Sequence, residues 1–516
     1  MNEQTTFDLI ILGGGPAGVT AALRASELGP ELKIAVIERN RMGGTCTNDG
    51  CVPTRALAHA ARLMRDADQF ADYGLTGAPP TLDLPALLAR TQQIVYTIQE
   101  KKQLIQHLRA AGVNVFTETG DASFVDAHTL ATTRGGRFRA EKFILCVGGH
   151  ARRLPFPGAE YALTHSDVWS LKALPRSVAI IGAAATGCQL ASIFADFGAQ
   201  VWLLELAPRI LPAEDAHVSQ AMEAAFRRKG IHIVTGIAGV ERITADGGRQ
   251  TAAIGDQPSA VGSPITLHYA QGNETHLLST DSILLAVGWP GNMERLNLPA
   301  AGLTPVGGFV PVNEFLQTSV PHIFAAGDIT GRMMLVQSAG HEARMAAENA
   351  VLGARQTYGH FIVPHGGFTD PEYGSVGLTE AQAANAAVAV VPFAEIDRAV
   401  IDGRTGGFCK LIVARETRQI LGAHVVGEQA VEVVQLVAAS MAAGSRVEQL
   451  AALELAYPTY TAIVGLAARR IAYELSLIPQ SPEWRALGRR AGEWEGVEQT
   501  ADERPQTAVG GLRLLD

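Results

Sequence analysis

Residues 7–18, FDLIILGGGPAG, begin an α/β unit. The apolar run 7–12 predicts a short strand, and the alanine-rich segment after the glycines predicts a helix. A second predicted strand, residues 33–37, ends on Glu38. Strand, helix and strand in this order predict parallel strands joined by a crossover helix, so the fold class is α/β.

The glycines of this unit have the spacing of a dinucleotide site. Gly13 allows the tight turn, Gly15 lets a pyrophosphate approach the backbone, and Gly18 lets helix and strand pack closely. Glu38 stands where an acid accepts a hydrogen bond from a ribose hydroxyl. Because strand, helix and acid are all in register, we interpret the unit as a nucleotide site instead of an ordinary turn.

A second unit of the same kind begins at Ser177. It combines a predicted strand 178–181, the turn GAAATG at 182–187, a helix, and a strand 201–204 that ends on Glu205. Gly182 and Gly187 keep their places, but Ala184 replaces the middle glycine and narrows the approach of a pyrophosphate. A nucleotide site and a cofactor-free repeat of the fold both remain open. Glu205 would repel a 2′-phosphate, which favours NADH over NADPH, although Arg209 nearby weakens this prediction.

Residues 43–55, GGTCTNDGCVPTR, hold the closely spaced cysteines Cys46 and Cys51. Residues 56–68 predict a helix, and Pro53 suits its first turn. Cys51 therefore lies at a helix N-terminus, where the dipole favours a thiolate. The spacing allows a disulfide if the turn 48–50 brings the α-carbons together. Two buried core thiols, or part of a zinc site, are the alternatives, although no second cysteine pair or Cys/His cluster completes a metal site.

Composition limits the partners. The chain has 516 residues, enough for several domains, and a formal net charge of -9. Without a basic run, neither nucleic acid nor an anionic membrane is expected as the main partner, which favours small molecules. No signal pattern and no membrane-length apolar run are visible, so we expect a cytoplasmic protein. Five cysteines are too few for a secreted disulfide framework.

Residues 43–55 closely resemble the redox-active disulfide motif of the pyridine-nucleotide disulfide oxidoreductases, the flavoprotein family of dihydrolipoamide dehydrogenase, glutathione reductase and mercuric reductase. The resemblance extends over residues 7–477. Residues 323–328, IFAAGD, resemble the second FAD motif, in which Asp328 would accept from a ribityl hydroxyl; an ordinary loop acid is the alternative. Residues 282–292 resemble the return to the FAD domain, with Trp289 where an arginine is usual.

The resemblance implies two Rossmann-like dinucleotide-binding domains and a C-terminal α+β dimerisation domain, with FAD and NAD(H) as cofactors and a homodimer as the assembly. The expected division is an FAD-binding part with the cysteines at 1–155, an NAD(H)-binding domain at 156–290, a second FAD-binding part at 291–360, a dimerisation domain at 361–478, and a polar tail at 479–516. No metal site is expected.

The resemblance also assigns site residues. The Cys51 position lies nearest the flavin as a charge-transfer thiolate, and the Cys46 position exchanges with substrate. The expected catalytic residues are Cys46, Cys51, Arg55 and Tyr457. The expected cofactor-binding residues are Gly13, Gly15, Gly18, Glu38, Gly44, Thr45, Gly148, Gly182, Gly187, Gln189, Glu205, Gly288, Gly327 and Asp328.

Two departures make the chain an atypical member. Relatives that reduce disulfides carry a His-Pro pair followed by a glutamate, where this chain has Tyr457 and Ala462. A tyrosine, with a pKa of about ten, is a poor base at neutral pH. The usual lysine after the disulfide is Arg55, and its glutamate partner is Gln189, so we expect Arg55 to be able to donate to the Gln189 amide oxygen.

The electron acceptor stays open. One possibility is a disulfide or dihydrolipoamide-type substrate with another base, and a second is a quinone, a metal ion or an oxidant. Mercuric reductases need a C-terminal cysteine pair, which residues 479–516 lack. The third possibility, of a different class, is a flavin-bearing redox sensor with little turnover.

Other segments predict structure without chemistry. Residues 83–112 predict helix, and Cys146, in the apolar run 143–147, is interpreted as a packed core thiol. Residues 251–264 predict a loop or hairpin insertion, and residues 479–516 predict a poorly packed tail.

Overall fold

The computed structural model describes residues 4–245, 264–359 and 362–479. The expected insertion at 251–264 and the expected tail at 479–516 lie outside these ranges, except for their residues 264 and 479. Within the described ranges, no helix combines the length and the apolar character needed to cross a membrane.

The N-terminal sheet is built on β1 (Thr5–Leu12), which pairs in parallel with β2 and β6. The sheet order is β3-β2-β1-β6-β5-β4, and β14 also pairs with β6. The side chains of Leu9 to Leu12 are at most 2% exposed, because Leu9 and Ile11 pack in a cluster with α1 and α8, and Ile10 and Leu12 pack in a second cluster on the other face. The bounds of the other strands are β2 (Ile34–Ile37), β3 (Asn114–Phe116), β4 (Ala122–Asp126), β5 (Thr129–Thr132), β6 (Arg137–Leu145) and β14 (Ile323–Ala325).

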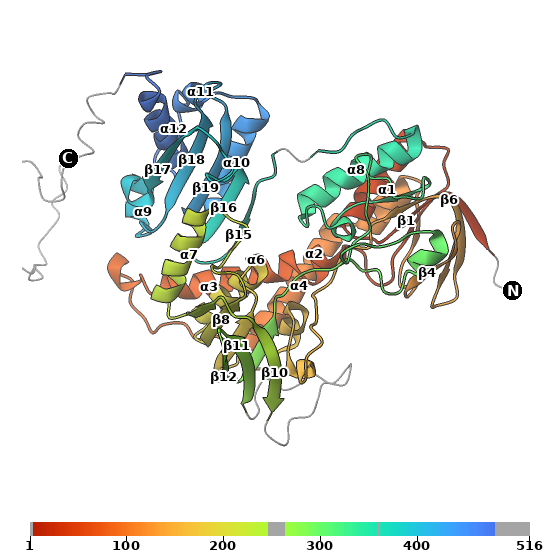
Figure 1. Cartoon of the computed structure of the whole chain (residues 1–516), viewed down its shortest axis with the longest axis horizontal. Helices are drawn as coiled ribbons and strands as arrows, with labels where there is room; N and C mark the ends of the chain where they lie inside the picture. Colours follow the sequence, from red (N-terminus) through yellow and green to blue (C-terminus); the bar gives the residue numbers. More distant parts are fainter. Residues whose placement is uncertain (1–3, 246–263, 360–361, 480–516) are drawn as a thin grey trace, which may run out of the picture.

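Residues far apart in sequence complete this part of the molecule. Helix α1 (Pro16–Leu28) packs beside α8 (Val336–Leu352), and the two lie together on the sheet (Figure 1). Cys146 follows β6 and is buried in the same core, which confirms its interpretation as a packed thiol.

The cysteine segment forms α2 (Gly44–Asn48) and α3 (Cys51–Ala67), so Cys51 starts a helix as predicted. The helix expected at 83–112 is in fact two, α4 (Leu84–Lys102) and α5 (Leu104–Ala110). The break falls on Gln103, whose φ of 42° is left-handed. Apolar spacing does not reveal such a break, because the periodic pattern continues on both sides of it.

The second βαβ unit forms a parallel sheet of order β13-β7-β8-β9. An antiparallel sheet of order β10-β11-β12 adjoins it. The elements are β7 (Ser177–Ile181), α6 (Ala185–Asp196), β8 (Gln200–Glu205), α7 (Ala216–Arg228), β9 (His232–Thr235), β10 (Gly239–Ala245), β11 (Ile265–Gln271), β12 (Glu274–Thr280) and β13 (Ser282–Leu285).

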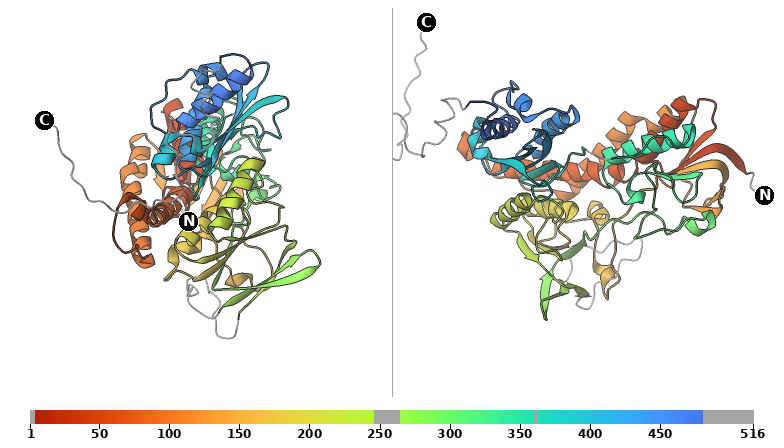
Figure 2. Two further views of the ribbon diagram at one scale, coloured as in Figure 1. Left: turned by 90° about the vertical axis from the view of Figure 1, so that its left-hand side faces the viewer. Right: turned by 45° about the horizontal axis from the view of Figure 1, so that its top comes forward.

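The C-terminal part is an antiparallel sheet of order β15-β16-β19-β18-β17 with helices. Figure 2 shows this sheet (blue) and the β10–β12 sheet (green) on opposite sides of the molecule. The elements are β15 (His365–Gly367), β16 (Glu372–Gly377), β17 (Ala386–Pro392), α9 (Asp397–Ile401), β18 (Phe408–Ala414), β19 (Ile420–Gly427), α10 (Ala430–Ala442), α11 (Val447–Ala451) and α12 (Ala462–Glu474).

Helix α3 connects these parts. Its buried residues Leu57 and Ala61 share one apolar cluster with β7 and α6 of the second unit, and Phe408 and Val426 of the C-terminal sheet belong to the same cluster. The helix that begins with Cys51 is therefore fixed by packing against two other parts of the chain. Such packing holds the end of a helix more precisely than a loop could.

Candidate active site

The first glycine motif forms a tight cradle. Gly13 has a φ of 102°, and a Cβ on Gly18 would lie 1.8 Å from the Gly13 carbonyl oxygen, so neither position accepts a side chain. Glu38 is buried and accepts from the backbone N–H of Gly14 (2.7 Å) and of Asn40 (2.8 Å). Each carboxylate oxygen keeps a lone pair that a ribose hydroxyl can use.

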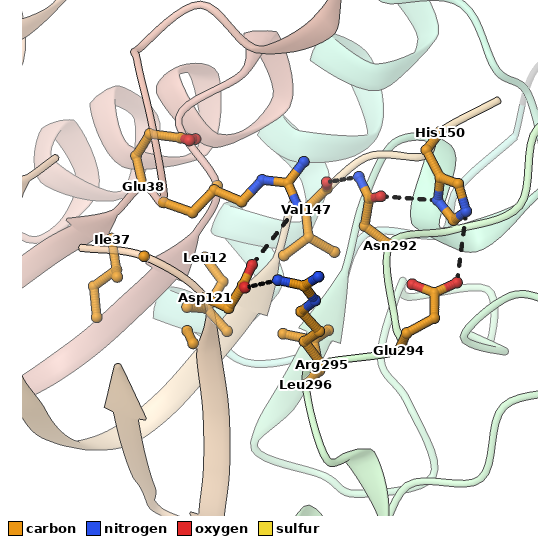
Figure 3. A pocket seen from close by; sticks show the side chains of 14 residues that line it. Leu12, Ile37, Glu38, Asp121, Val147, His150, Asn292, Glu294, Arg295 and Leu296 are labelled. Atoms are coloured by element: carbon orange, nitrogen blue, oxygen red, sulfur yellow. Dashed lines mark hydrogen bonds and ion pairs between the residues drawn. The ribbon is translucent and has the colours of Figure 1, made fainter. Parts of the chain in front are cut away.

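A cavity of about 440 Å³ opens beside this cradle, at the carboxyl ends of β1 and β2. Figure 3 shows Glu38 on one side of it and His150 and Asn292 on the other. The Asn292 side chain donates to the Val147 carbonyl (2.8 Å), and its oxygen lies 2.9 Å from Nδ1 of His150. The volume falls in the range of small-molecule sites.

The far wall of the cavity carries charges that the motifs did not indicate. Asp121 pairs with Arg295 and lies 3.8 Å from Arg39 (Figure 3). These residues come from separate segments of the first sheet and the return chain. An acid at the ribose position, a cradle without side chains and a cavity of this size fit the adenosine end of a dinucleotide.

Cys46 and Cys51 meet at the junction of α2 and α3, where the two thiols are hydrogen-bonded. The bond from the Cys46 thiol lowers the pKa of Cys51 to about 7, although burial acts in the opposite direction. The same bond, together with burial, raises the pKa of Cys46 above its ordinary value. The pair can therefore hold one proton on Cys46 and a thiolate on Cys51, which is the division of roles expected from the family.

The cysteine loop packs directly on the first glycine motif. Gly44 has a φ of 58°, and a Cβ there would lie 2.7 Å from the Gly15 α-carbon. Thr45 follows in α2, and its carbonyl accepts from the N–H of Gly50, which closes the turn between the cysteines. The close approach of Gly44 to Gly15 brings the cysteine pair next to the nucleotide cradle.

Asp49, inside the cysteine loop, was not identified from sequence. Its carboxylate accepts from Ser166 (2.6 Å) and from the Trp169 indole (2.9 Å), and lies 3.4 Å from Nε2 of His165. These three partners belong to the short 3₁₀ segment η3 (His165–Ser170), which precedes the second unit. Asp49 thus ties the loop between the cysteines to the second unit.

We expect Asp49→Val to lower the thermal unfolding midpoint, because it removes the carboxylate that accepts from Ser166 and Trp169 and leaves Trp169 only the backbone carbonyl of residue 49 (3.0 Å). Hydrogen bonds to charged groups are worth about 1.5–3 kcal/mol. In a double-mutant cycle, the same change in a Trp169→Phe background should cost less. Calorimetry of the wild type, the two single variants and the double variant gives the unfolding midpoints. If the two decreases in midpoint simply add, Asp49 and Trp169 do not interact.

The structure gives Arg55 and Gln189 separate partners. Arg55 lies over the Phe368 ring, 3.2 Å from its centroid, and 4.0 Å from the Glu372 carboxylate. Gln189 instead accepts from the Phe368 N–H (3.3 Å) and donates to the Ala185 carbonyl (3.1 Å). The carboxylate near Arg55 therefore comes from β16 of the C-terminal sheet, and the guanidinium group stacks on an aromatic ring.

The second glycine motif repeats the first in detail. A Cβ on Gly187 would lie 1.8 Å from the Gly182 carbonyl oxygen, and Gly182 has a φ of 99°. Glu205 accepts from Ala183 N–H (2.6 Å) and Ala207 N–H (2.9 Å), as Glu38 does in the first unit. The Arg209 guanidinium donates to the carbonyl oxygens of Pro212 and Glu214, both at 2.8 Å.

Trp289 has a defined contact. Its indole N–H donates to Asp328 Oδ2 (2.9 Å), and its ring lies 5.2 Å from that of His165. Burial raises the pKa of the Asp328 carboxyl, while the bond from Trp289 acts against this rise. Gly327, before Asp328, has a φ of 80°. Trp289, in the position where relatives have an arginine, therefore donates a hydrogen bond to Asp328, the acid expected to bind FAD.

Gly148 and Gly288 lie on the two segments of the chain that connect the first nucleotide unit with the second. Both have positive φ, 69° and 124°. The Gly148 carbonyl accepts from the Asn292 N–H (3.0 Å), and Gly288 accepts from the Arg152 N–H (3.0 Å). These bonds, together with an isolated β-bridge between Gly149 and Gly291, hold the two segments together.

Tyr457 is not part of this cluster in the single chain. It lies before α12, its side chain is 77% exposed, and its hydroxyl donates to Asp397 of the C-terminal part. Ala462, the other residue in place of the usual dyad, is the first residue of α12.

The comparisons with known proteins agree with this arrangement. Residues 7–343 match the family model "Pyridine nucleotide-disulphide oxidoreductase", and residues 363–468 match its dimerisation domain. A dihydrolipoyl dehydrogenase of Zymomonas mobilis is 34% identical over 439 residues, covering 83% of this chain and 90% of that protein. A mercuric reductase of Lysinibacillus sphaericus is 30% identical over 475 residues, covering 90% and 83%.

A solved structure of similar fold is the HOCl-induced flavoprotein disulfide reductase RclA of Escherichia coli. Its TM-score is 0.76 at 26% identity, over 90% of this chain and 99% of that one. RclA has also been solved as a Cu(II) complex. The chain belongs to the pyridine nucleotide-disulphide oxidoreductase family.

Family membership defines the cofactors and the class of enzyme. The protein is an oxidoreductase that uses FAD and NAD(H), and it carries the family's dimerisation domain. When bound, FAD supplies the hydride chemistry between the nicotinamide and the cysteine pair. The cavity, Glu38 and the crowded Gly13–Gly18 contact would hold its adenosine end. The domain boundaries and the roles of individual site residues remain predictions.

Proposed function

We propose that the protein takes two electrons from NADH and uses them to reduce a Cys46–Cys51 disulfide, which then reduces a small-molecule acceptor. The supporting observation is the hydrogen-bonded thiol pair at the start of α3, in which the pKa of Cys51 is lowered to about 7. Reduction breaks the S–S bond and takes up two electrons and one proton, the equivalent of the hydride that NADH gives, and leaves a Cys46 thiol and a Cys51 thiolate. Re-oxidation restores the bond and releases the same electrons and proton to the acceptor.

The proposed acceptor is reduced without proton transfer from the His–Glu pair that relatives use. Tyr457 and Ala462 stand in place of that dyad, and Tyr457 is a weak base whose pKa is raised further by its bond to Asp397. Disulfide or dihydrolipoamide-type acceptors are one class; quinones, metal ions and oxidants are the other. The Cu(II) complex of RclA favours testing metal ions within the second class.

We propose a homodimer, because residues 363–468 match the family's dimerisation domain. In this assembly the exposed Tyr457 of one subunit would face the Cys46 of its partner. Sedimentation velocity at micromolar concentration tests this arrangement; a monomer would remove Tyr457 from the site.

A single experiment separates the proposals. The purified holoprotein is mixed with NADH without oxygen in a stopped-flow instrument, and lipoamide, glutathione disulfide, a quinone and Cu(II) are then offered one at a time. Fast flavin reduction followed by turnover with one class identifies the acceptor. Fast reduction without turnover on any acceptor would leave the redox sensor, and a flavin that NADH does not reduce would contradict the proposed function.

NADH is expected to reduce the flavin about tenfold more efficiently than NADPH, if one repelled charge decides the preference. Glu205 is expected at the ribose, and one guanidinium nitrogen of Arg209 donates to two backbone carbonyls. Comparing kcat/KM for both nucleotides checks this. Glu205→Gln should narrow the ratio, and a wild-type preference for NADPH would refute the role of Glu205.

A further inference from the structure

The C-terminal end of α4 brings a cation to the cysteine loop. Lys102 is the last residue of α4, and the left-handed Gln103 turns the chain immediately after it. The Lys102 ammonium donates to the Thr47 hydroxyl (3.3 Å), and Thr47 is the neighbour of Cys46. Lys102 itself is exposed, so its charge is accessible to a molecule approaching the thiols.

A second contact shows that this end of α4 is docked on the loop. Gln99, one turn before Lys102, donates to the Asn48 side-chain oxygen, and Asn48 in turn donates to the Met42 carbonyl (3.2 Å). Residues 99 and 102 lie on one face of the helix, so both point toward α2. The position of the ammonium is therefore set by helix packing and not by one flexible side chain.

Two charged residues, Lys102 and Asp328, act on the thiols in opposite directions. Lys102 favours the thiolate form of both cysteines and lowers their pKa, whereas Asp328 raises the pKa of both. Asp328 is half-buried and bonded to Trp289, while Lys102 is exposed. A molecule that approaches the pair from solvent meets the positive charge.

We propose that Lys102 is a specificity-determining residue. Its ammonium, bound to the neighbour of Cys46, favours acceptors with a negative charge close to the atom that Cys46 attacks, and it disfavours cationic acceptors. This inference rests on the proposed exchange of electrons between Cys46 and the acceptor. Within the second class it favours anionic oxidants over metal cations, because a positive field raises the local concentration of anions.

The test uses two thiol reagents that differ in charge. The holoprotein is reduced either with NADH or with a phosphine, and alkylated with anionic iodoacetate or neutral iodoacetamide. In each reaction a Cys–S bond to carbon forms and iodide leaves. Peptide mass spectrometry then gives the rates separately for Cys46 and Cys51.

Lys102→Met is expected to lower the iodoacetate to iodoacetamide rate ratio at Cys46 about two- to fivefold, the effect of one exposed charge. Lys102→Arg should keep the wild-type ratio, and the difference should shrink in high salt. Lys101→Met is the matched control. Lys101 is also exposed, and among the described residues it makes no hydrogen bond or ion pair with the cysteine loop.

Two outcomes would overturn the proposal: an unchanged ratio in Lys102→Met, or an equal fall with both reagents, which indicates altered loop geometry and not charge selection. The two reductants separate this inference from the proposed function. If NADH fails to expose the thiols but the phosphine succeeds, the proposed function fails, while the phosphine-reduced samples still decide the role of Lys102.

Discussion

Replacing Cys51 with serine is expected to abolish the long-wavelength absorbance band that the wild-type protein shows under anaerobic NADH. The band requires a thiolate beside the flavin. Cys51 is the thiol whose pKa is lowered, and it starts α3 in the segment whose Gly44 packs on the nucleotide cradle. The loss should be complete, because serine does not ionise in this pH range. Anaerobic spectra of the two proteins make the comparison.

The same band should depend on pH in a predictable direction. The pKa of Cys51 is lowered to about 7, and the thiolate is the deprotonated form. The band should therefore be present above pH 7 and fade as the pH falls through about 7. A matched control is Cys46→Ser, which keeps Cys51 and prevents the disulfide, so its band should appear without NADH. An unchanged band in Cys51→Ser would assign the thiolate to another residue.

Restoring the acid–base pair with Tyr457→His and Ala462→Glu is expected to raise disulfide turnover about a hundredfold to ten-thousandfold, the usual contribution of general acid–base catalysis. The wild-type hydroxyl at 457 donates to Asp397, which raises its pKa away from neutrality, whereas a histidine titrates near pH 7. Steady-state rates with lipoamide and glutathione disulfide give the change.

Two controls accompany the double variant. Quinone turnover should stay nearly constant, because a quinone needs no proton at a substrate sulfur. Tyr457→Phe removes the hydroxyl without adding a base, so it should leave disulfide turnover low. If the wild-type disulfide rate already keeps pace with flavin reduction at neutral pH, another group delivers the proton and the missing dyad has no consequence.

The local elements could be predicted because their signals lie within a few residues. An apolar run before Gly13 or Gly182 predicts a buried strand, and the glycine spacing predicts the turn that follows. The start of α3 at Cys51 follows from Pro53 and the helical segment behind it. The structure confirms these elements and the burial of Cys146.

Contacts between distant segments could not be predicted in this way. The family resemblance suggested Gln189 as a possible partner for Arg55, but the structure places Arg55 near the Glu372 carboxylate and over the Phe368 ring. Asp49 looked like an ordinary turn residue until η3 supplied its three partners. Periodicity gives the face of an element but not the segment that covers it.

The sequence by itself therefore determined the α/β class, the two nucleotide units, the cysteine pair at a helix start and the missing dyad, because each depends on near neighbours in the chain. Tertiary structure alone decided the bond from Trp289 to Asp328, the contacts of Asp49 with η3 and the bond from Lys102 to Thr47, the neighbour of Cys46. In each of these contacts at least 39 residues separate the partners. Only the packing of whole helices and sheets brings such partners together, since the chain between them carries no local record of which surfaces will meet.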